Sequence, residues 1–88
     1  MSASDATGGA GELPAHQHEV DATGLNCPLP ILRAKKALAQ MGSGDVLRVL
    51  TTDPNAVRDF QAFSRQTGNA LLAQQSDDGR TAHFLRRR

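Results

Sequence analysis

The chain has 88 residues, of which 39% are hydrophobic and 22% are charged, so we expect one small domain with a modest core and no second folded domain. Ten Lys and Arg residues against nine Asp and Glu residues give a formal net charge of +1, which excludes a global field that would attract nucleic acid or a membrane surface. No apolar run approaches the roughly 18 residues that a membrane helix needs, and residues 1–15 lack the basic and apolar segments of a signal peptide, so we expect a cytoplasmic protein.

The N-terminal residues 1–16 are predicted to be a disordered tail, and residues 17–88 the folded domain. Small and polar residues dominate the tail, which offers too little apolar surface to offset the entropy of ordering it. Apolar and acidic side chains then alternate along residues 17–22, which is typical of a half-buried strand. The following turn contains Gly24, which can adopt a positive φ.

Two prolines open the first predicted helix. Pro28 and Pro30 follow Cys27, and proline is favoured at the first helical position because its missing N–H has no intrahelical partner there. This places Cys27 at or beside the N-cap. Apolar residues then recur at helical spacing until Gly42, where we expect a left-handed stop. This core stripe is Ile31, Ala34, Leu38 and Met41.

The second half of the chain predicts a strand, a helix and a hairpin. Residues 45–51 are rich in apolar residues and are predicted to be the most buried strand. Asp53-Pro54 resembles a capping carboxylate followed by a helix start, and that helix ends before Gly68. Residues 69–75 and 81–85 flank an Asp-Gly turn, which predicts a closing hairpin. The apolar stripe of the second helix is Ala56, Val57, Phe60 and Phe63.

The element order β-α-β-α-β-β predicts an α/β fold, a two-layer sandwich in which two helices cover one face of a mixed four-stranded sheet. A right-handed crossover makes the first two strands parallel neighbours. Because parallel strands end at the same edge of a sheet, we expect residues 51–53 and the start of the second helix to lie near Cys27.

Cys27 is the single cysteine of the chain, which excludes an internal disulfide and a Cys-x-x-Cys site. A lone cysteine is often a small buried hydrophobe. At a helix start, however, the sulfur faces unpaired amides, of which Leu29 N–H is the expected donor, and the positive end of the helix dipole. We therefore expect the pKa of Cys27 to be depressed. Asp53 would oppose this effect, although its favoured role is that of an N-cap.

Four residues of the first helix lie on the side away from the core stripe and flank the cysteine. Two exposed leucines beside two cations form a plausible docking surface for an apolar and acidic partner. Scattered surface leucines on a solvated basic face are the alternative. The four residues are Leu29, Leu32, Arg33 and Lys36.

The remaining candidates are weaker. His16 and His18 could bind a metal, but no further ligand motif accompanies them, so we expect a solvated pair and no metal site. His83 is expected to be an ordinary strand residue, and a Cys27/His83 dyad would require their strand ends to meet. The basic C-terminal run at residues 86–88 could contact phosphate, but such terminal charges are usually solvated.

One segment carries a family resemblance: Gly24-Leu25-Asn26-Cys27-Pro28-Leu29-Pro30, followed by Asp53-Pro54 and Asp59-Phe60. It resembles the TusA (SirA/YedF-like) sulfur-carrier family, over about residues 17–88. The resemblance implies the two-layer fold described above. It also implies that Cys27 carries a persulfide sulfur, that Pro28 and Pro30 are the prolines of the motif, and that Asp53 belongs to the family's acidic loop. Some relatives have acidic residues where Leu29 and Thr52 stand.

The resemblance further implies protein partners. A donor such as a cysteine desulfurase would load Cys27, and an acceptor protein would take the sulfur for tRNA thiolation, molybdenum cofactor assembly or sulfur metabolism. Such a sulfurtransferase-type carrier needs an accessible thiolate and no cofactor, and a second cysteine would discharge the sulfur. We expect no membrane partner and no direct nucleic-acid partner. A regulatory or RNA-binding α/β module and a single-cysteine redox sensor remain alternative functions.

Overall fold

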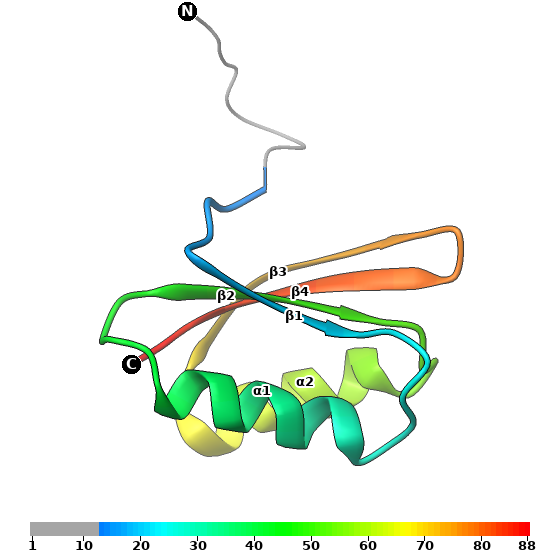
Figure 1. Cartoon of the computed structure of the whole chain (residues 1–88), viewed down its shortest axis with the longest axis horizontal. Helices are drawn as coiled ribbons and strands as arrows, with labels where there is room; N and C mark the ends of the chain where they lie inside the picture. The colour runs from blue at the N-terminus through cyan, green and yellow to red at the C-terminus, as the bar shows by residue number, and fades with distance from the viewer. Residues whose placement is uncertain (1–12) are drawn as a thin grey trace, which may run out of the picture.

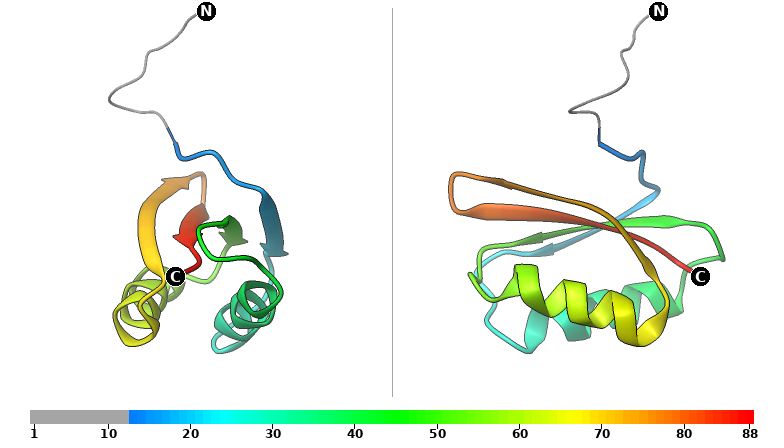
Figure 2. Two further views of the ribbon diagram at one scale, coloured as in Figure 1. Left: turned by 90° about the vertical axis from the view of Figure 1, so that its left-hand side faces the viewer. Right: turned by 180° about the vertical axis from the view of Figure 1, so that it is seen from behind.

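The computed structural model describes residues 13–88, which fold into two layers with both helices on one face of the sheet (Figures 1 and 2). This confirms the predicted α/β sandwich and its element order. Most of the predicted tail, residues 1–16, lies outside the described residues, and residues 13–16 belong to no helix or strand. The elements are β1 (His18–Ala22), α1 (Leu29–Ala39), β2 (Val46–Thr51), α2 (Ala56–Thr67), β3 (Ala70–Asp77) and β4 (Arg80–Arg86).

The sheet has the strand order β1-β2-β4-β3. β1 pairs with β2 in parallel, as predicted, whereas β2–β4 and β3–β4 are antiparallel. The parallel register aligns Ala22 with Thr51, so β1 and β2 end side by side. Both helices therefore begin near the same edge of the sheet, and this edge positions the candidate site.

The main core lies between the helices and the sheet. Leu47, Val49 and Leu85 point from the sheet toward Phe60 and Phe63, and all five side chains are buried. Burying a side chain of this size stabilises the fold by about 1.5–3 kcal/mol. The other face of the sheet holds a smaller buried cluster, which consists of Val46, Ala82 and Phe84.

The end of α1 differs from the prediction. Gly42 is not a left-handed stop, because the helix ends at Gln40 in a right-handed conformation. The N–H groups of Gln40 and Met41 donate to the carbonyls of Ala37 and Leu38, at 3.0 and 3.1 Å. These bonds satisfy the last carbonyls without a left-handed residue. Gly68, in contrast, ends α2 with a φ of 82°, as expected for a left-handed glycine.

The helix lengths also bear on membrane insertion. Within residues 13–88, no helix is both long enough and apolar enough to span a bilayer.

Candidate functional site

Cys27 is exposed and lies in the connection between β1 and α1. This connection is fixed to the end of β2, since Gly24 N–H donates to Thr52 Oγ1 at 2.8 Å. Gly24 itself has a φ of 79°, a conformation that favours glycine. The loop before the cysteine is therefore held in place by its glycine turn and by the hydrogen bond to the residue that follows β2.

Asp53 links the beginnings of the two helices. Its Oδ2 accepts a hydrogen bond from Cys27 N–H at 2.8 Å, and its Oδ1 accepts one from Asn55 N–H at 3.0 Å. The expected N-cap assignment is wrong in position, because Asn55 is the N-cap and α2 begins at Ala56. Asp53 still satisfies an amide that precedes this helix. The carboxylate therefore fixes the cysteine backbone and the approach to α2 together.

The start of α1 also departs from the expected geometry. Pro28 occupies the N-cap and the helix begins at Leu29, so Cys27 precedes the N-cap by one residue. Leu29 N–H, the donor that we expected for the sulfur, donates instead to the carbonyl of Asn26 at 2.9 Å. Pro30 is buried. The two prolines remove further N–H groups, so the helix start supplies the sulfur with less amide stabilisation than we expected.

The surroundings raise the pKa of the Cys27 thiol, which contradicts our expectation of a depressed value. The first cause is desolvation, because neighbouring protein atoms displace water that would stabilise the thiolate even though the side chain is exposed. A hydrogen bond with Asp59 and the negative charges of Asp59 and Asp53 act in the same direction. Desolvation and negative charge therefore both favour the neutral thiol over the thiolate at this sulfur.

Asp59 was missed as a site residue by the sequence reasoning. It lies in the first turn of α2, where an acidic residue is ordinarily explained by the helix dipole alone. Its only signal in the sequence was the Asp59-Phe60 pair within the family resemblance. Nothing in helical periodicity relates it to a cysteine on another element.

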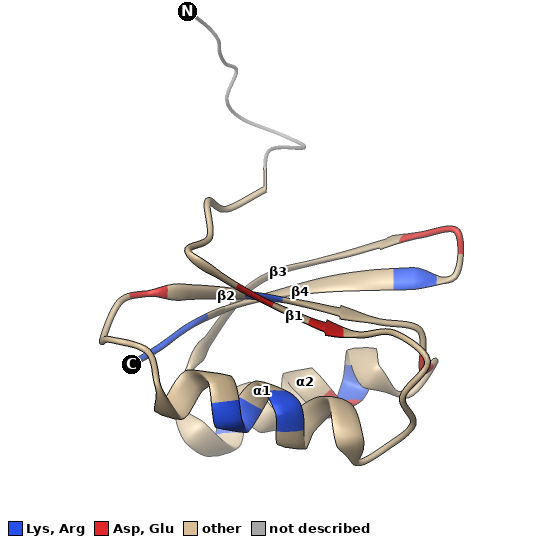
Figure 3. Ribbon diagram, in the orientation of Figure 1, with Lys and Arg blue, Asp and Glu red and all other residues tan. Residues whose placement is uncertain are grey.

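The exposed side of α1 has the composition that the helical spacing predicted. Leu29 and Leu32 are 45% and 52% exposed, and Arg33 and Lys36 are exposed beside them. Figure 3 shows the basic residues along this helix. We name these four residues the docking face. Arg33 and Lys36 also line a cleft between α1 and β1, whose floor includes Val20 and Ala37.

The two N-terminal histidines bind separate carboxylates. His16 Nε2 lies 3.3 Å from Glu19, and His18 Nε2 lies 3.2 Å from Asp45. The His16 ring also packs edge-on against Phe84, with 5.9 Å between ring centroids. Across residues 13–88, no group of three or more His, Cys, Asp or Glu side chains is arranged to hold a metal.

His83 is fully buried beneath α2 and does not form a dyad with Cys27. Its ring stacks on Phe60 with 4.4 Å between centroids. The Gln74 amide donates to Nδ1 at 2.9 Å, which leaves Nε2 to donate to Thr51 Oγ1 at 2.8 Å. Burial lowers the pKa of His83 to about 4, so the ring is neutral at neutral pH. The histidine is a satisfied part of the core.

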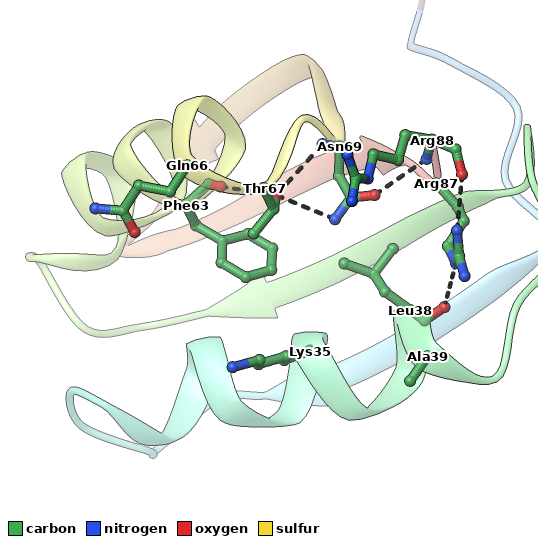
Figure 4. A pocket seen from close by; sticks show the side chains of 9 residues that line it. All are labelled: Lys35, Leu38, Ala39, Phe63, Gln66, Thr67, Asn69, Arg87 and Arg88. Atoms are coloured by element: carbon green, nitrogen blue, oxygen red, sulfur yellow. Dashed lines mark hydrogen bonds between the residues drawn. The ribbon is translucent and has the colours of Figure 1, made fainter.

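A cavity of about 350 Å³ lies between the C-terminal ends of the two helices (Figure 4). We name it the C-terminal groove, and its basic lining residues are Lys35, Arg87 and Arg88. Arg87 Nε donates to the carbonyl of Leu38 at 2.8 Å, and Arg88 N–H donates to Asn69 Oδ1 at 3.0 Å. The expected solvated C-terminal arginines are thus partly engaged within the fold. The groove lies at the opposite helix ends from Cys27.

Comparisons with known proteins give one consistent result. The sequence profile of the family described as sulfurtransferase TusA matches residues 18–87. The chain is 60% identical over 67 residues to the sulfur carrier protein TusA of Allochromatium vinosum, covering 76% of this chain and 87% of that protein. It is 38% identical over 73 residues to the sulfur carrier protein TusA of Pseudomonas entomophila, covering 83% and 91%.

A solved structure agrees with these sequence matches. The crystal structure of a SirA-like protein from Desulfitobacterium hafniense superposes with a TM-score of 0.71 and 30% sequence identity. The match covers 80% of this chain and 96% of that protein.

Proposed function

This chain belongs to the sulfurtransferase TusA family and is a sulfur carrier, and from that premise we propose that it carries the sulfur as a persulfide on Cys27. The observation that supports this most directly is the exposed position of the only cysteine at the edge where both helices begin. Persulfide relay requires a sulfur that two successive protein partners can reach. Residues 17–88 form the proposed sulfur-carrier domain.

The reaction consists of two thiol exchanges. Cys27 attacks the outer sulfur of a donor persulfide, such as that of a cysteine desulfurase, and the donor cysteine leaves as a thiolate. A thiolate of the acceptor protein then attacks the outer sulfur on Cys27. A second cysteine within reach would release this sulfur as sulfide by forming a disulfide, and this chain has none.

The residues around Cys27 have supporting roles in this proposal. Gly24 and Asp53 hold the loop through the hydrogen bonds to Thr52 and Cys27 N–H, so the sulfur is presented at a fixed place. Pro28 and Pro30 set the chain direction into α1. A partner therefore meets a positioned sulfur on an exposed connection between β1 and α1.

The docking face is the proposed binding surface for these partners. Leu29 and Leu32 offer apolar contact next to Cys27, and Arg33 and Lys36 offer positive charge one turn further along α1. Such a surface favours a protein partner that presents an apolar patch with an acidic rim.

The test uses a cysteine desulfurase with free cysteine as the sulfur source. We expect intact-mass spectrometry to show the gain of one sulfur atom on the wild-type protein and no gain on Cys27→Ser. The serine variant is a close match in size, and at an exposed position it leaves the fold unchanged. Uptake of sulfur by the serine variant would refute the assignment, because no other thiol exists in the chain.

A further inference from the structure

β1 lies at an edge of the sheet, and β2 is its only strand partner within the described part of the chain. It lies on the same side of the molecule as α1 (Figure 2). A strand carries N–H and C=O groups on both of its sides, so the outer side of β1 can pair with a further strand. The register between β1 and β2 runs from His18 to Ala22 without a shift. β1 therefore presents a regular edge, which we name the β1 edge.

The other edge strand, β3, is less suited to pairing. Its register with β4 shifts between Leu71 and Ala73, which marks a β-bulge or a similar irregularity. Bulges are one of the ways in which proteins protect an exposed strand edge from further pairing. Of the two edges of this sheet, the β1 edge is therefore the better place for an added strand.

The cleft between β1 and α1 has a volume of about 510 Å³ and adjoins the β1 edge. β1 contributes Val20 and Asp21 to its lining, and the cations of the lining are Arg33 and Lys36 of α1. Neither cation takes part in an ion pair with another described residue. The Asp21 carboxylate instead accepts hydrogen bonds from the backbone N–H and the hydroxyl of Thr23, at 3.0 and 2.7 Å. The cleft therefore holds two positive charges that no ion pair neutralises.

We propose that an extended acidic segment of a partner protein adds to the sheet along the β1 edge. The backbone of the segment pairs with β1, and its acidic side chains lie against Arg33 and Lys36 in the cleft. β1 leads through residues 23–26 to Cys27, so a partner held on this edge is held next to the sulfur. The inference deepens the proposed function, and its role in sulfur transfer rests on that function.

The geometry of β1 also restricts the sequence of the added segment. Successive side chains of a strand point to opposite faces of the sheet, and Val20 packs toward the core beneath the helices. Glu19 lies on the opposite face, where its carboxylate accepts a hydrogen bond from Arg48 at 3.1 Å. We therefore expect acidic side chains at every second position of the segment, facing α1, and uncharged side chains at the positions between, which lie beside Glu19.

The first test of strand pairing uses the peptide acetyl-Glu-Thr-Glu-Thr-Glu-amide, titrated into the ¹⁵N-labelled full chain and followed by NMR. We expect saturable shifts of the amide signals of His18–Ala22. Two further peptides carry N-methyl groups, one on its Glu amides and the other on its Thr amides. Only one of these sets of N–H groups faces β1 in a paired strand, so one methylated peptide should bind roughly tenfold more weakly or worse and the other should bind like the parent.

The second test concerns the charges of the cleft. We expect Arg33→Gln with Lys36→Gln to weaken binding of the unmodified peptide roughly three- to tenfold, since each exposed ion pair contributes modestly. Added salt should weaken binding to the wild type more than to this double variant. The matched control is Lys35→Gln with Arg65→Gln, which makes the same change in net charge at exposed positions outside the cleft and should leave the affinity close to that of the wild type.

The outcomes separate this inference from the proposed function. Absence of binding, equal binding of both methylated peptides, or shifts concentrated in β3 instead of β1 would each overturn the inference. None of these results affects the uptake of sulfur by Cys27, which tests the carrier function on its own. If the peptide adds to β1 while Cys27 takes up no sulfur from the desulfurase, the binding site stands and the carrier assignment is refuted.

Discussion

The two ends of the helix pair differ in which polar or reactive groups remain available to another molecule. At the C-terminal groove, a cavity of about 350 Å³ is lined in part by Lys35, Arg87 and Arg88. The Arg87 guanidinium already donates to the carbonyls of Leu38 and Arg88, whereas Arg88 is bound to Asn69 through its backbone N–H. At the other end, a hollow of about 450 Å³ is lined by Thr52, Asp53 and Pro54, whereas the Cys27 sulfur is exposed and the docking face lies beside it. A protein that exchanges sulfur with other proteins needs an accessible group rather than an enclosed one. Because both ends are hollowed, concavity is a poor guide to the proposed carrier site in this molecule.

The largest expected effect is a difference in how much a substitution at each end lowers the free energy of unfolding. Phe63 is buried beside the C-terminal groove, so we expect Phe63→Ala to lower the free energy of unfolding by about 3–5 kcal/mol. Leu32→Ala, at an exposed position of the docking face, should lower it by less than about 1 kcal/mol. Urea unfolding followed by circular dichroism measures both. Equal losses would show that the docking face is part of the core.

A charge reversal tests whether the two ends differ in partner binding. We expect Arg33→Glu with Lys36→Glu to slow association with an acidic donor protein roughly tenfold, because electrostatic attraction accelerates encounter. The matched control is Lys35→Glu with Arg65→Glu, which changes net charge equally but lies off the docking face. Stopped-flow or surface plasmon resonance at two salt concentrations gives the rates. Equal slowing in both double variants would mean that net charge, and not the docking face, controls encounter.

The smallest effect concerns the titration of the sulfur. We expect the pKa of the wild-type Cys27 thiol to lie above the ordinary value of free cysteine, which is about 8.5, because desolvation and the carboxylates of Asp59 and Asp53 disfavour the thiolate. Asp59→Asn should lower this pKa, whereas a change at the C-terminal groove such as Lys35→Gln should leave it unmoved. The measurement is the pH dependence of the iodoacetamide alkylation rate. A wild-type value below that of free cysteine would show that the helix dipoles dominate.

The fold was largely predictable because its signals are local. Period-two alternation along 17–22, the apolar run at 45–51 and the Asp-Gly turn each specify an element without reference to distant residues. The predicted end of α1 was wrong. The N–H groups of Gln40 and Met41 bond to the last carbonyls of the helix, and no residue type in the sequence indicates these turn bonds. His83 was expected in a strand, and only the register opposite Val49 reveals that it faces the buried side of the sheet.

The site was predictable in position but not in electrostatics. Parallel strand ends brought Asp53 to Cys27, as the topology required. The sign of the pKa shift was wrong because the pKa depends first on desolvation of the sulfur and then on Asp59, which belongs to another helix. In addition, the expected hydrogen-bond donor to the sulfur, Leu29 N–H, donates to the carbonyl of Asn26 instead. Dipole arguments count the charges of one helix, whereas a titration responds to all nearby charges together.

The strand order has a consequence for how the molecule is built during synthesis. β2 lies between β1 and β4, so its second edge remains unpaired until residues 80–86 have been made and have reached the sheet. The segment that contains Cys27 leaves the ribosome early, yet the sheet that supports it closes with the last strand. Pairings between residues so distant in sequence form late and together in folding. A nascent chain therefore exposes its thiol before the frame that positions it exists, and the proposed carrier site is complete only when the last strand has paired.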